Sequence, residues 1–426
     1  MSDHRFDFDT LCLHAGQIPD AATGARALPI YQTTSFVFDS ADHAASLFNL
    51  QTFGNVYSRI SNPTVAALEE RVAALEGGRA ALAAATGMAA QMCALLTLCR
   101  NGDHLVASRT LYGGTYSQFA VTFAQFGIET TFVDADAPEN FRQALKPSTK
   151  AIYAETIGNP QLNIADIEAL GGVARSAGIP LVIDNTLASP YLCRPFEHGA
   201  DIVVHSLTKY LGGHGTTMGG IVVESGKFPW DNGNFPQMTE PSRGYHGVRF
   251  YETFGDFGFT MKARMETMRT LGPTLSPFAA FLLLQGIETL HVRMPRHCES
   301  TLAIAEHLAG HPRIEWVNYP LLKGNRYEML ARKYLPRGAS GILTFGVKGG
   351  AKAGERLIES VQMLSHLANV GDAKTLIIHP ASTTHRQLSE DEQRAAGVSP
   401  EMIRLSVGLE SLSDILWDLD QALEKT

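Results

Sequence analysis

Two groups of residues near the middle of the chain could carry out covalent chemistry on a small ligand. Lys209 lies in the run VVHSLTKYLGGHG together with Ser206 and Thr208. A lysine amine can form an imine, and hydroxyls in a glycine-rich turn suit a phosphate. Asp184 ends the apolar run PLVID, where its carboxylate could pair with a cationic ring nitrogen. The ordinary alternatives are a solvated lysine after a capped turn and an aspartate that caps a helix.

Two further groups could supply an anion site and a flat ring face. Thr86 and Gly87 precede a strongly helical run, and free N–H groups at a helix start bind anions. Tyr112, just after HLVAS, could stack on a planar ligand. The ordinary alternatives are a plain helix cap for Thr86 and Gly87 and a core tyrosine for Tyr112. Pyridoxal 5′-phosphate (PLP) needs a lysine, a carboxylate for its ring nitrogen and donors for its phosphate. The combination therefore predicts a PLP site.

The elements that must position these residues alternate between short apolar runs and helical patterns. Apolar, β-branched runs lie at 104–108, 129–133, 151–155, 180–184, 201–205 and 219–223, and helical periodicity spans 164–178. This alternation predicts an α/β fold with a mainly parallel sheet covered by helices. Ligands of such sheets bind beyond the carboxyl ends of the strands. The four groups are therefore expected at one edge of one sheet.

The domain organisation follows from the same patterns. Residues 1–63 carry many turn formers and are interpreted as an extended N-terminal arm, and residues 64–288 form the large, ligand-binding domain. Residues 289–426 contain the strand patterns 342–347 and 403–407 among helices and predict a smaller C-terminal α/β domain. Residues 228–255, rich in Pro, Gly, Asn and aromatic residues, are expected to form a long surface insertion.

Composition argues against several classes of protein. The chain has 426 residues, of which 45% are hydrophobic and 18% charged, as in folded multi-domain proteins. A net charge of −8 disfavours nucleic acid or an anionic membrane as the main partner. The polar start MSDHRFDFDT lacks the apolar core of a signal peptide, and no apolar run is long enough to span a membrane. Five scattered cysteines without a CxxC pair indicate neither disulfides nor a metal site, and favour a cytoplasmic location.

Short motifs spread over the whole chain resemble those of a known enzyme family. They are YSRISNPT, TGMAA, ETIGNP, VIDNT, SLTKYLGGHG, SPFAAFLLLQGIETL, HPASTTH and RLSVGLE. In this order they resemble the Cys/Met-metabolism PLP enzymes, the cystathionine γ-synthase-like group of fold-type I. The resemblance implies a fold-type I PLP-dependent transferase that forms a homotetramer, a dimer of dimers with shared active sites.

The resemblance also implies roles for individual residues. Lys209 would bind PLP covalently and act as a base, Asp184 would pair with the ring nitrogen, and Tyr112 would stack on the ring and could assist proton transfer. The phosphate would be held by Gly87, Met88, Ser206 and Thr208, and by Tyr57 and Arg59 from the arm of a neighbouring subunit. The substrate would be bound by Asn159, Asn369 and Arg404, of which Asn159 and Arg404 would hold its carboxylate. Without the resemblance, Arg59 would be interpreted as a surface arginine and Arg404 as a strand-edge charge.

Departures from the wider family point to one branch of it. Gly114 stands where methionine γ-lyases have a cysteine, and Asn369 where the lyases and cystathionine synthases usually have a serine. ETIGNP lacks their usual proline, and the 228–255 insertion lengthens the chain. These features are similar to the O-acetylhomoserine sulfhydrylases, which implies γ-replacement of acetate by sulfide to form homocysteine in methionine biosynthesis. The alternatives are a cystathionine γ-synthase, or a sulfhydrylase for O-succinylhomoserine or O-acetylserine.

Two other classes of protein are less well supported by the residues. A nicotinamide oxidoreductase would show GxGxxG after an early strand, with an acid about 20 residues further on. The glycines of LGGHGTTMGG do not have that spacing. A binding protein without activity would not need both Lys209 and Asp184.

Overall fold

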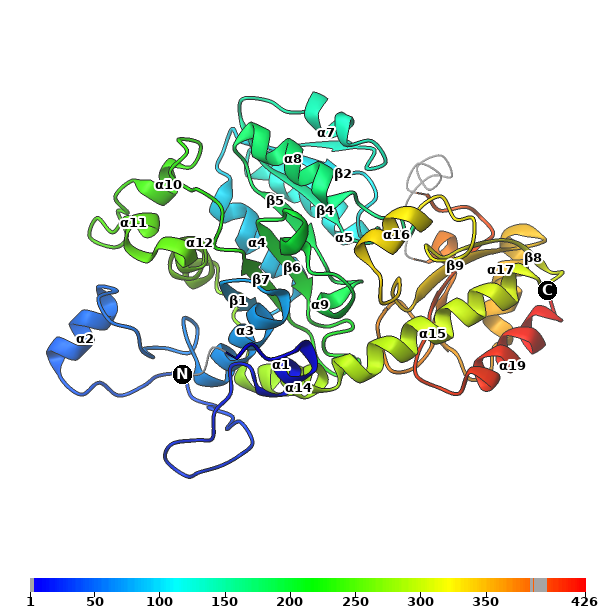
Figure 1. Cartoon of the computed structure of the whole chain (residues 1–426), viewed down its shortest axis with the longest axis horizontal. Coiled ribbons are helices and arrows are strands. Elements are labelled where there is room, and N and C mark those ends of the chain that lie inside the picture. Colours follow the sequence, from blue (N-terminus) through cyan, green and yellow to red (C-terminus); the bar gives the residue numbers. More distant parts are fainter. Residues whose placement is uncertain (1–3, 384–385, 387–396) are drawn as a thin grey trace.

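The computed structural model describes residues 4–383, 386 and 397–426, which form two sheets flanked by helices (Figure 1). The larger sheet has seven strands in the order β1-β7-β6-β5-β4-β2-β3. Its strands are β1 Ala80–Ala84, β2 His104–Ser108, β3 Glu129–Val133, β4 Thr149–Glu155, β5 Leu181–Asp184, β6 Ile202–Ser206 and β7 Gly220–Glu224. All neighbours are parallel except that β7 runs antiparallel to β6 and β1. The predicted fold class, with a mainly parallel central sheet, is confirmed.

Strand β1 is the one strand of this sheet that the sequence patterns did not indicate. Its sequence, AALAA, consists mainly of alanine, which favours helices over strands. In the structure, β1 pairs along its whole length with β7, from Ala80 opposite Glu224 to Ala84 opposite Gly220. Tertiary pairing with a β-branched partner strand therefore overrides the local preference of this segment.

Helix α8 (Ile167–Ala177) shows how local sequence sets the helix bounds around the sheet. The carboxylate of Asp166 accepts a hydrogen bond from the N–H of Ala169 and caps the first turn. Gly178 ends the helix with φ of 65°, a left-handed conformation that glycine adopts without strain. The chain then enters β5 at once, which places Asp184 at the far edge of the sheet. The helix predicted within 164–178 is therefore present with slightly narrower bounds.

The smaller sheet lies in the C-terminal part of the chain, at the right of Figure 1. Its order is β10-β11-β12-β9-β8, with β8 Ile314–Asn318, β9 Ile342–Val347, β10 Ser365–His366, β11 Leu376–Ile378 and β12 Met402–Ser406. The long helix α15 (Leu290–Ala309) leads from the large sheet to this one, and α17 (Gly350–Ser360) and α19 (Leu412–Leu423) pack together against it. Strands β9 and β12 match the two predicted runs, and the short β10 and β11 had no clear pattern.

The remaining helices surround both sheets. They are α3 Pro63–Glu76, α4 Gly87–Leu98, α5 Gly113–Ser117, η1 Gln118–Thr122, α6 Phe123–Gln125, α7 Pro138–Gln143, α9 Ser189–Leu192, η2 Pro195–His198, η3 Gly255–Phe257, α12 Gly258–Lys262, η4 Ala263–Met268, α13 Arg269–Leu271, α14 Pro277–Glu288, α16 Glu328–Tyr334 and η5 Pro380–Ser382. No helix in the described ranges is long and apolar enough to cross a membrane. Residues 384–385 of the HPASTTH motif lie outside the described residues.

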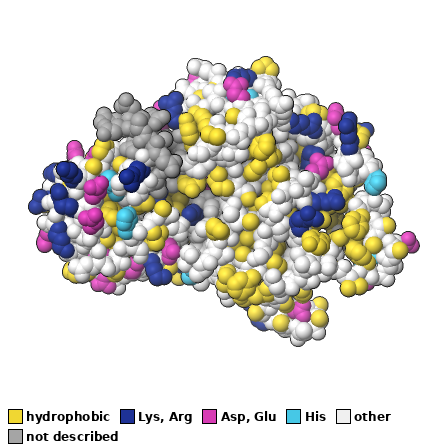
Figure 2. Space-filling view, turned by 180° about the vertical axis from the view of Figure 1, so that it is seen from behind, with side chains coloured by type: hydrophobic (Ala, Val, Ile, Leu, Met, Phe, Trp, Pro, Cys, Tyr) yellow, Lys and Arg dark blue, Asp and Glu magenta, His cyan; other side chains and the backbone are white. Residues whose placement is uncertain are grey.

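The N-terminal arm contains two short helices, α1 (Phe8–His14) and α2 (Ala41–Phe48). Helix α1 is anchored by the buried Arg71 of α3, which donates hydrogen bonds to the carbonyls of Ala15 and Cys12. Helix α2 projects at the left edge of the molecule in Figure 1. Apolar side chains of the arm stay open, with Val37 96% and Phe53 76% exposed. On the reverse side, Figure 2 shows yellow hydrophobic side chains over the end of the molecule that carries the arm.

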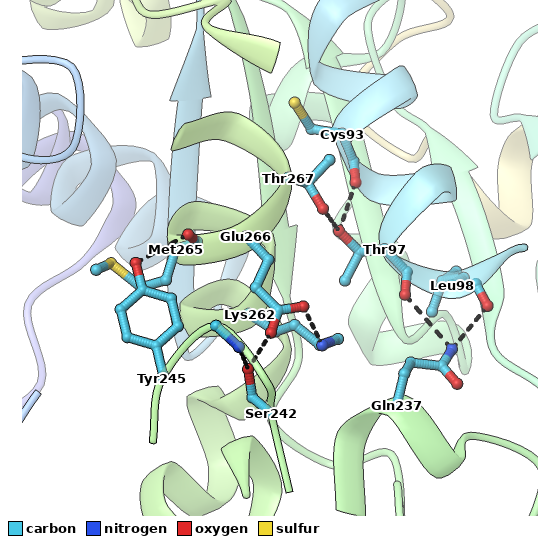
Figure 3. A network of polar contacts seen from close by, with 11 residues as sticks. Cys93, Thr97, Leu98, Gln237, Ser242, Tyr245, Lys262, Met265, Glu266 and Thr267 are labelled. Atoms are coloured by element: carbon cyan, nitrogen blue, oxygen red, sulfur yellow. Dashed lines mark hydrogen bonds and ion pairs between the residues drawn. The ribbon is translucent and has the colours of Figure 1, made fainter. Parts of the chain in front are cut away.

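The 228–255 segment differs from the expected surface insertion, because an aromatic cluster packs it onto the large sheet's helices. It contains α10 (Pro236–Thr239) and α11 (Phe250–Phe254), and Trp230 stacks on Phe259 with 5.3 Å between ring centroids. Figure 3 shows the polar contacts that fasten it. Gln237 donates to the carbonyl of Leu98 at the end of α4 (2.8 Å), and Ser242 donates to Glu266 of η4 (2.6 Å). The burial of its aromatic side chains therefore holds this segment against the helices, although its sequence is typical of a surface loop.

Candidate active site

Asp184 is the last residue of β5 and lies beside Glu155, the last residue of β4, because the two are paired in parallel register. One carboxylate oxygen of Asp184 accepts the backbone N–H of Thr186 at 2.9 Å. The other lies 3.4 Å from the hydroxyl of Tyr153. Burial raises the pKa of Asp184, while the Thr186 hydrogen bonds and nearby His205 act in the opposite direction. A cationic N–H placed against this carboxylate would offset the cost of its burial.

Lys209 lies in the turn after β6 and reaches toward the smaller domain. Its amine donates a hydrogen bond to the side-chain oxygen of Asn369 at 2.5 Å. Burial, together with the positive charge of Arg404, lowers the pKa of Lys209 to about 8. A large share of the amine is therefore neutral near pH 8, which is the form that attacks a carbonyl.

Arg404 of β12 brings the two predicted substrate-binding asparagines together. It is only 8% exposed, and its guanidinium donates to the side chain of Asn159 (3.2 Å) and to the carbonyl of Asn369 (3.4 Å). Burial lowers the pKa of Arg404 to about 10. No acidic side chain within the described ranges forms an ion pair with it. A buried guanidinium in this state suits a carboxylate ligand.

The start of α4 meets the end of β6 to form an anion-binding corner. Thr86 caps α4 by accepting the N–H of Ala89 (3.0 Å). The N–H groups of Gly87 and Met88, at the start of the helix, have no helical acceptor. Gly87 packs so closely that an added Cβ would lie 2.7 Å from the Cβ of Ser206. The Ser206 hydroxyl makes no hydrogen bond to any residue that the structure describes, and is free to donate to a phosphate.

Thr208, predicted at the same corner, is engaged differently. Its hydroxyl exchanges hydrogen bonds with the backbone of Gly219, donating to the carbonyl (3.3 Å) and accepting from the N–H (3.2 Å). This pairing closes the glycine-rich turn that carries Lys209. Thr208 therefore lies in the predicted turn, but its hydroxyl has a protein partner already.

Tyr112 starts the short helix α5, and its ring is 53% exposed at the mouth of this region. Its backbone N–H donates to the Glu155 carboxyl at 2.6 Å. A Cβ added to Gly114 would lie 2.5 Å from the Tyr112 ring, so the ring can occupy this position because residue 114 has no side chain. The side chain of a cysteine at Gly114 would require the ring to move.

Tyr57 and Arg59 lie on the arm rather than in this cluster. The Tyr57 side chain is 42% exposed, and the Arg59 guanidinium stands 5.5 Å from its ring centroid. The backbone carbonyl of Arg59 accepts a hydrogen bond from Thr274 at 2.9 Å. Among the described residues, no hydrogen bond or ion pair joins either side chain to Lys209, Asp184 or Ser206.

A buried polar network beneath the site was missed by sequence reasoning. The Tyr153 hydroxyl lies 3.1 Å from the side-chain oxygen of Gln91, whose amide donates to Gln118 (2.7 Å). Gln118 in turn donates to the carbonyl of Met88 (3.3 Å), so the network runs from Asp184 to the start of α4. A signal was present in β4, where Tyr153 and Glu155 stand two residues apart among the alanines and isoleucine of its buried second half.

The arrangement fits PLP on its own chemistry. It holds the partly neutral Lys209, the buried carboxylate of Asp184, which forms no ion pair with a described residue, and the Ser206 hydroxyl beside the start of α4. These are the groups that an aldehyde, a protonated ring nitrogen and a phosphate require. The unpaired Arg404 beside Lys209 adds a place for a substrate carboxylate. No cluster of three or more potential metal ligands occurs in the described part of the chain.

Comparison with known proteins gives consistent results over the full chain. The profile of the Cys/Met metabolism PLP-dependent enzymes matches residues 9–424. The O-acetyl-L-homoserine sulfhydrylase of Leptospira meyeri is 54% identical, over 98% of this chain and 97% of that protein. The homocysteine/cysteine synthase of Saccharomyces cerevisiae is 49% identical, over 98% of this chain and 97% of that protein. A Campylobacter jejuni structure, described as an O-acetylhomoserine (thiol)-lyase with a pyridoxyl-lysine phosphate, has a TM-score of 0.95 and 42% identity and covers 98% of this chain and 100% of its own.

Proposed function

The chain belongs to the Cys/Met metabolism PLP-dependent enzymes, and we propose that it replaces the acetyl group of O-acetyl-L-homoserine with sulfide, forming L-homocysteine and acetate. The single observation that carries the substrate class is Arg404, a buried guanidinium without an acidic partner among the described residues, next to Lys209. It suits the carboxylate of an amino acid whose amine must reach the lysine. The names of the relatives supply the acyl group and the nucleophile.

Bound PLP supplies an electron sink for negative charge at the substrate α-carbon. In our proposal Lys209 moves protons at the α- and β-carbons, since its amine has a pKa of about 8 and is freed once the substrate amine takes its place. Asp184 would hold the ring N–H, and the Tyr112 ring would stack on the cofactor and could assist proton transfer at the amine. Arg404 and Asn159 bind the carboxylate, while Asn369 orients the lysine through its 2.5 Å contact.

The phosphate end of the site would combine groups from two subunits. Ser206 and the first N–H groups of α4 at Gly87 and Met88 would bind it from one chain, with Thr208 shaping the turn. Tyr57 and Arg59 would bind it from the arm of a neighbouring chain, because in their own chain no hydrogen bond or ion pair between described residues joins their side chains to the site. The open apolar residues of the arm support assembly with further copies of the chain, which we propose to be a homotetramer built from dimers. The proposal also comprises a cytoplasmic location, an arm (1–63), a large domain (64–288) and a small domain (289–426).

The competing substrates differ in the acyl donor and the nucleophile. Cystathionine γ-synthase activity would use cysteine, and other sulfhydrylases would use O-succinylhomoserine or O-acetylserine. One relative is named as both a homocysteine and a cysteine synthase, which favours O-acetylserine as the second donor to examine.

A panel of donors and nucleophiles tests the proposal. The purified holoenzyme would be supplied with O-acetylhomoserine, O-succinylhomoserine or O-acetylserine, each with sulfide or with cysteine, and the products separated chromatographically. We expect the highest kcat/KM for O-acetylhomoserine with sulfide. Faster turnover with cysteine would make the chain a cystathionine synthase, and a preference for either other donor would replace the proposed substrate.

A further inference from the structure

Glu155 lies at the edge of the large sheet where the parallel strands end, yet none of the roles proposed above involves it. It ends β4 beside Asp184 of β5, is 6% exposed, and faces the same side of the sheet because the two residues are paired in parallel register. Carboxylates are rarely buried without partners that satisfy them. The partners of Glu155 are therefore informative.

These partners are backbone groups of two different loops. The N–H of Tyr112, at the end of the loop after β2, donates to the Glu155 carboxyl at 2.6 Å. The backbone N–H of Asn159, in the loop after β4, also hydrogen-bonds to this carboxyl. One loop carries the ring proposed to stack on PLP, and the other carries an amide proposed to bind the substrate carboxylate. A single side chain thus joins the two loops that flank Asp184.

The neighbouring carboxyls of Glu155 and Asp184 have different electrostatic surroundings. Burial and the negative charge of Asp184 raise the pKa of Glu155 well above its usual range. Asp184 has the hydrogen bonds of Thr186 and the proximity of His205, which favour its ionised form. The raised pKa favours the neutral form of Glu155, whose carbonyl oxygen still accepts a hydrogen bond, so its acceptor rather than its charge would serve the loops.

We propose that Glu155 is a positioning residue that holds the Tyr112 loop and the Asn159 loop at a fixed separation across the cofactor site. The proposal rests on the roles given above to Tyr112 and Asn159. It predicts that the length of the side chain matters and that its charge does not. A neutral side chain of the same length with an acceptor oxygen preserves the function, and a shorter charged side chain loses it.

Two substitutions separate these properties. Glu155→Gln keeps the length and the acceptor oxygen, while Glu155→Asp keeps the carboxyl but withdraws it from the Tyr112 N–H by one methylene. The matched control is Glu224→Asp, since Glu224 is another buried carboxyl that accepts a backbone N–H (Thr260, 2.8 Å). It lies at the opposite edge of the same sheet, paired with the first residue of β6.

The holoenzyme variants are compared by the visible circular dichroism of bound PLP and by spectral titration with glycine, which has no leaving group. We expect Glu155→Asp to weaken glycine binding about tenfold, or about 1.4 kcal/mol, and to alter the dichroism, because the Tyr112 N–H loses its acceptor and its loop is no longer held. Glu155→Gln should stay within about twofold of the wild type, and Glu224→Asp should change only the melting temperature.

The reverse order, with Glu155→Gln impaired and Glu155→Asp normal, would show that charge matters and overturn the proposal. Equal behaviour of Glu155→Asp and Glu224→Asp in both optical measurements would also overturn it, since that result describes a purely structural carboxyl. Glycine titration does not depend on the acyl donor. A failure of the donor panel with the expected glycine order would therefore reject the proposed substrate and leave the role of Glu155 intact.

Discussion

Arg404 differs from the other buried arginines of the chain in how its donors are used. Arg293 donates to three backbone carbonyls, at 2.7 to 3.3 Å, and to a threonine hydroxyl, and Arg71 donates to two carbonyls and lies 3.5 Å from Glu288. Among the described residues, the Arg404 guanidinium has two hydrogen bonds, both long, at 3.2 and 3.4 Å. Donor capacity left over in a buried guanidinium indicates a ligand, whereas full use of the donors indicates a structural role.

Replacing Arg404 with alanine should damage substrate binding and spare the cofactor. Loss of a buried charge-assisted contact costs roughly 2–5 kcal/mol, so kcat/KM should fall by about thirtyfold to a few thousandfold. Steady-state kinetics measure the loss, and the absorbance of bound PLP serves as the control. Loss of PLP with unchanged substrate affinity would place Arg404 at the phosphate instead.

Lys209 should set the pH dependence of cofactor loading. Its lowered pKa of about 8 means that the amine is charged below pH 8 and neutral above it. The rate at which apoenzyme binds PLP covalently should therefore rise as pH increases through about 8, as stopped-flow absorbance would record. In Lys209→Ala, PLP should bind without covalent attachment, and turnover should be lost. Borohydride reduction followed by peptide mapping would refute the assignment if it labelled another lysine.

Gly114 and Gly113 offer a matched pair for the placement of the Tyr112 ring. A Cβ at Gly114 would lie 2.5 Å from the ring, whereas a Cβ at Gly113 meets nothing within 4 Å. Forcing a side chain off its rotamer costs about 0.5–1.5 kcal/mol, so Gly114→Ala should lower kcat/KM by roughly two- to tenfold. Gly113→Ala should remain close to the wild type. Equal kinetics for the two variants would argue that the ring position does not matter.

At the scale of elements, the 228–255 segment acts as a brace on the helix that starts the phosphate site. Its α10 meets the last turn of α4, and its following loop meets η4 (Figure 3). The last carbonyls of α4 have no helical donors, so Gln237 satisfies groups that would otherwise be buried and unpaired. The brace lies at the end of α4 that is remote from Gly87.

Removing this brace should therefore affect stability more than catalysis. Gln237→Ala leaves carbonyls of Thr97 and Leu98 without a donor, which should lower the free energy of unfolding by about 1–3 kcal/mol. KM should stay unchanged, because the start of α4 is held separately by Thr86. Gln143→Ala, an exposed helical position, is the control for chemical denaturation. A large rise in KM for Gln237→Ala would connect the segment to the substrate site.

For the whole molecule, we propose that the N-terminal arm connects the phosphate site to the assembly of subunits. Its open apolar residues, Val37 and Phe53 among them, would be costly on an isolated chain and are typical of a surface that another subunit covers. Tyr57 and Arg59 are carried on the same arm. Assembly and completion of the phosphate site are therefore expected to occur together.

Hybrid assemblies test this link directly. Arg59→Ala and Lys209→Ala subunits should each be inactive alone, but a mixed dimer places one intact arm over one intact lysine. Unfolding and refolding the two together should restore part of the wild-type activity, measured after tagged hybrids are purified. Verified hybrids without any activity would mean that each chain builds its own site.

Local patterns were sufficient for much of the fold and for placing Lys209 and Asp184 at one edge of the large sheet. The apolar, β-branched runs 104–108, 129–133 and 342–347 coincide with β2, β3 and β9, because such residues favour strands. The cap residues bounded α8 to within a few residues. Asp184 ends β5 and Lys209 follows the neighbouring strand β6, and the carboxyl ends of parallel strands meet at one edge. Their placement at the same edge of the sheet was therefore predictable from the sequence patterns.

Only the tertiary structure decided features that depend on distant partners. Strand β1 exists because β7 pairs with alanines that would otherwise favour a helix. The packed state of 228–255 depends on Phe259 and the end of α4, which no local pattern contains. Arg404 meets Asn159 across 245 positions of sequence, and Glu155 is significant because its neighbours are the backbone of one loop and Asp184 of another strand. The sequence specifies which side chains could take part in the chemistry. Which of them are buried, and which keep unpaired hydrogen-bond donors, is decided only when the sheets and loops pack together.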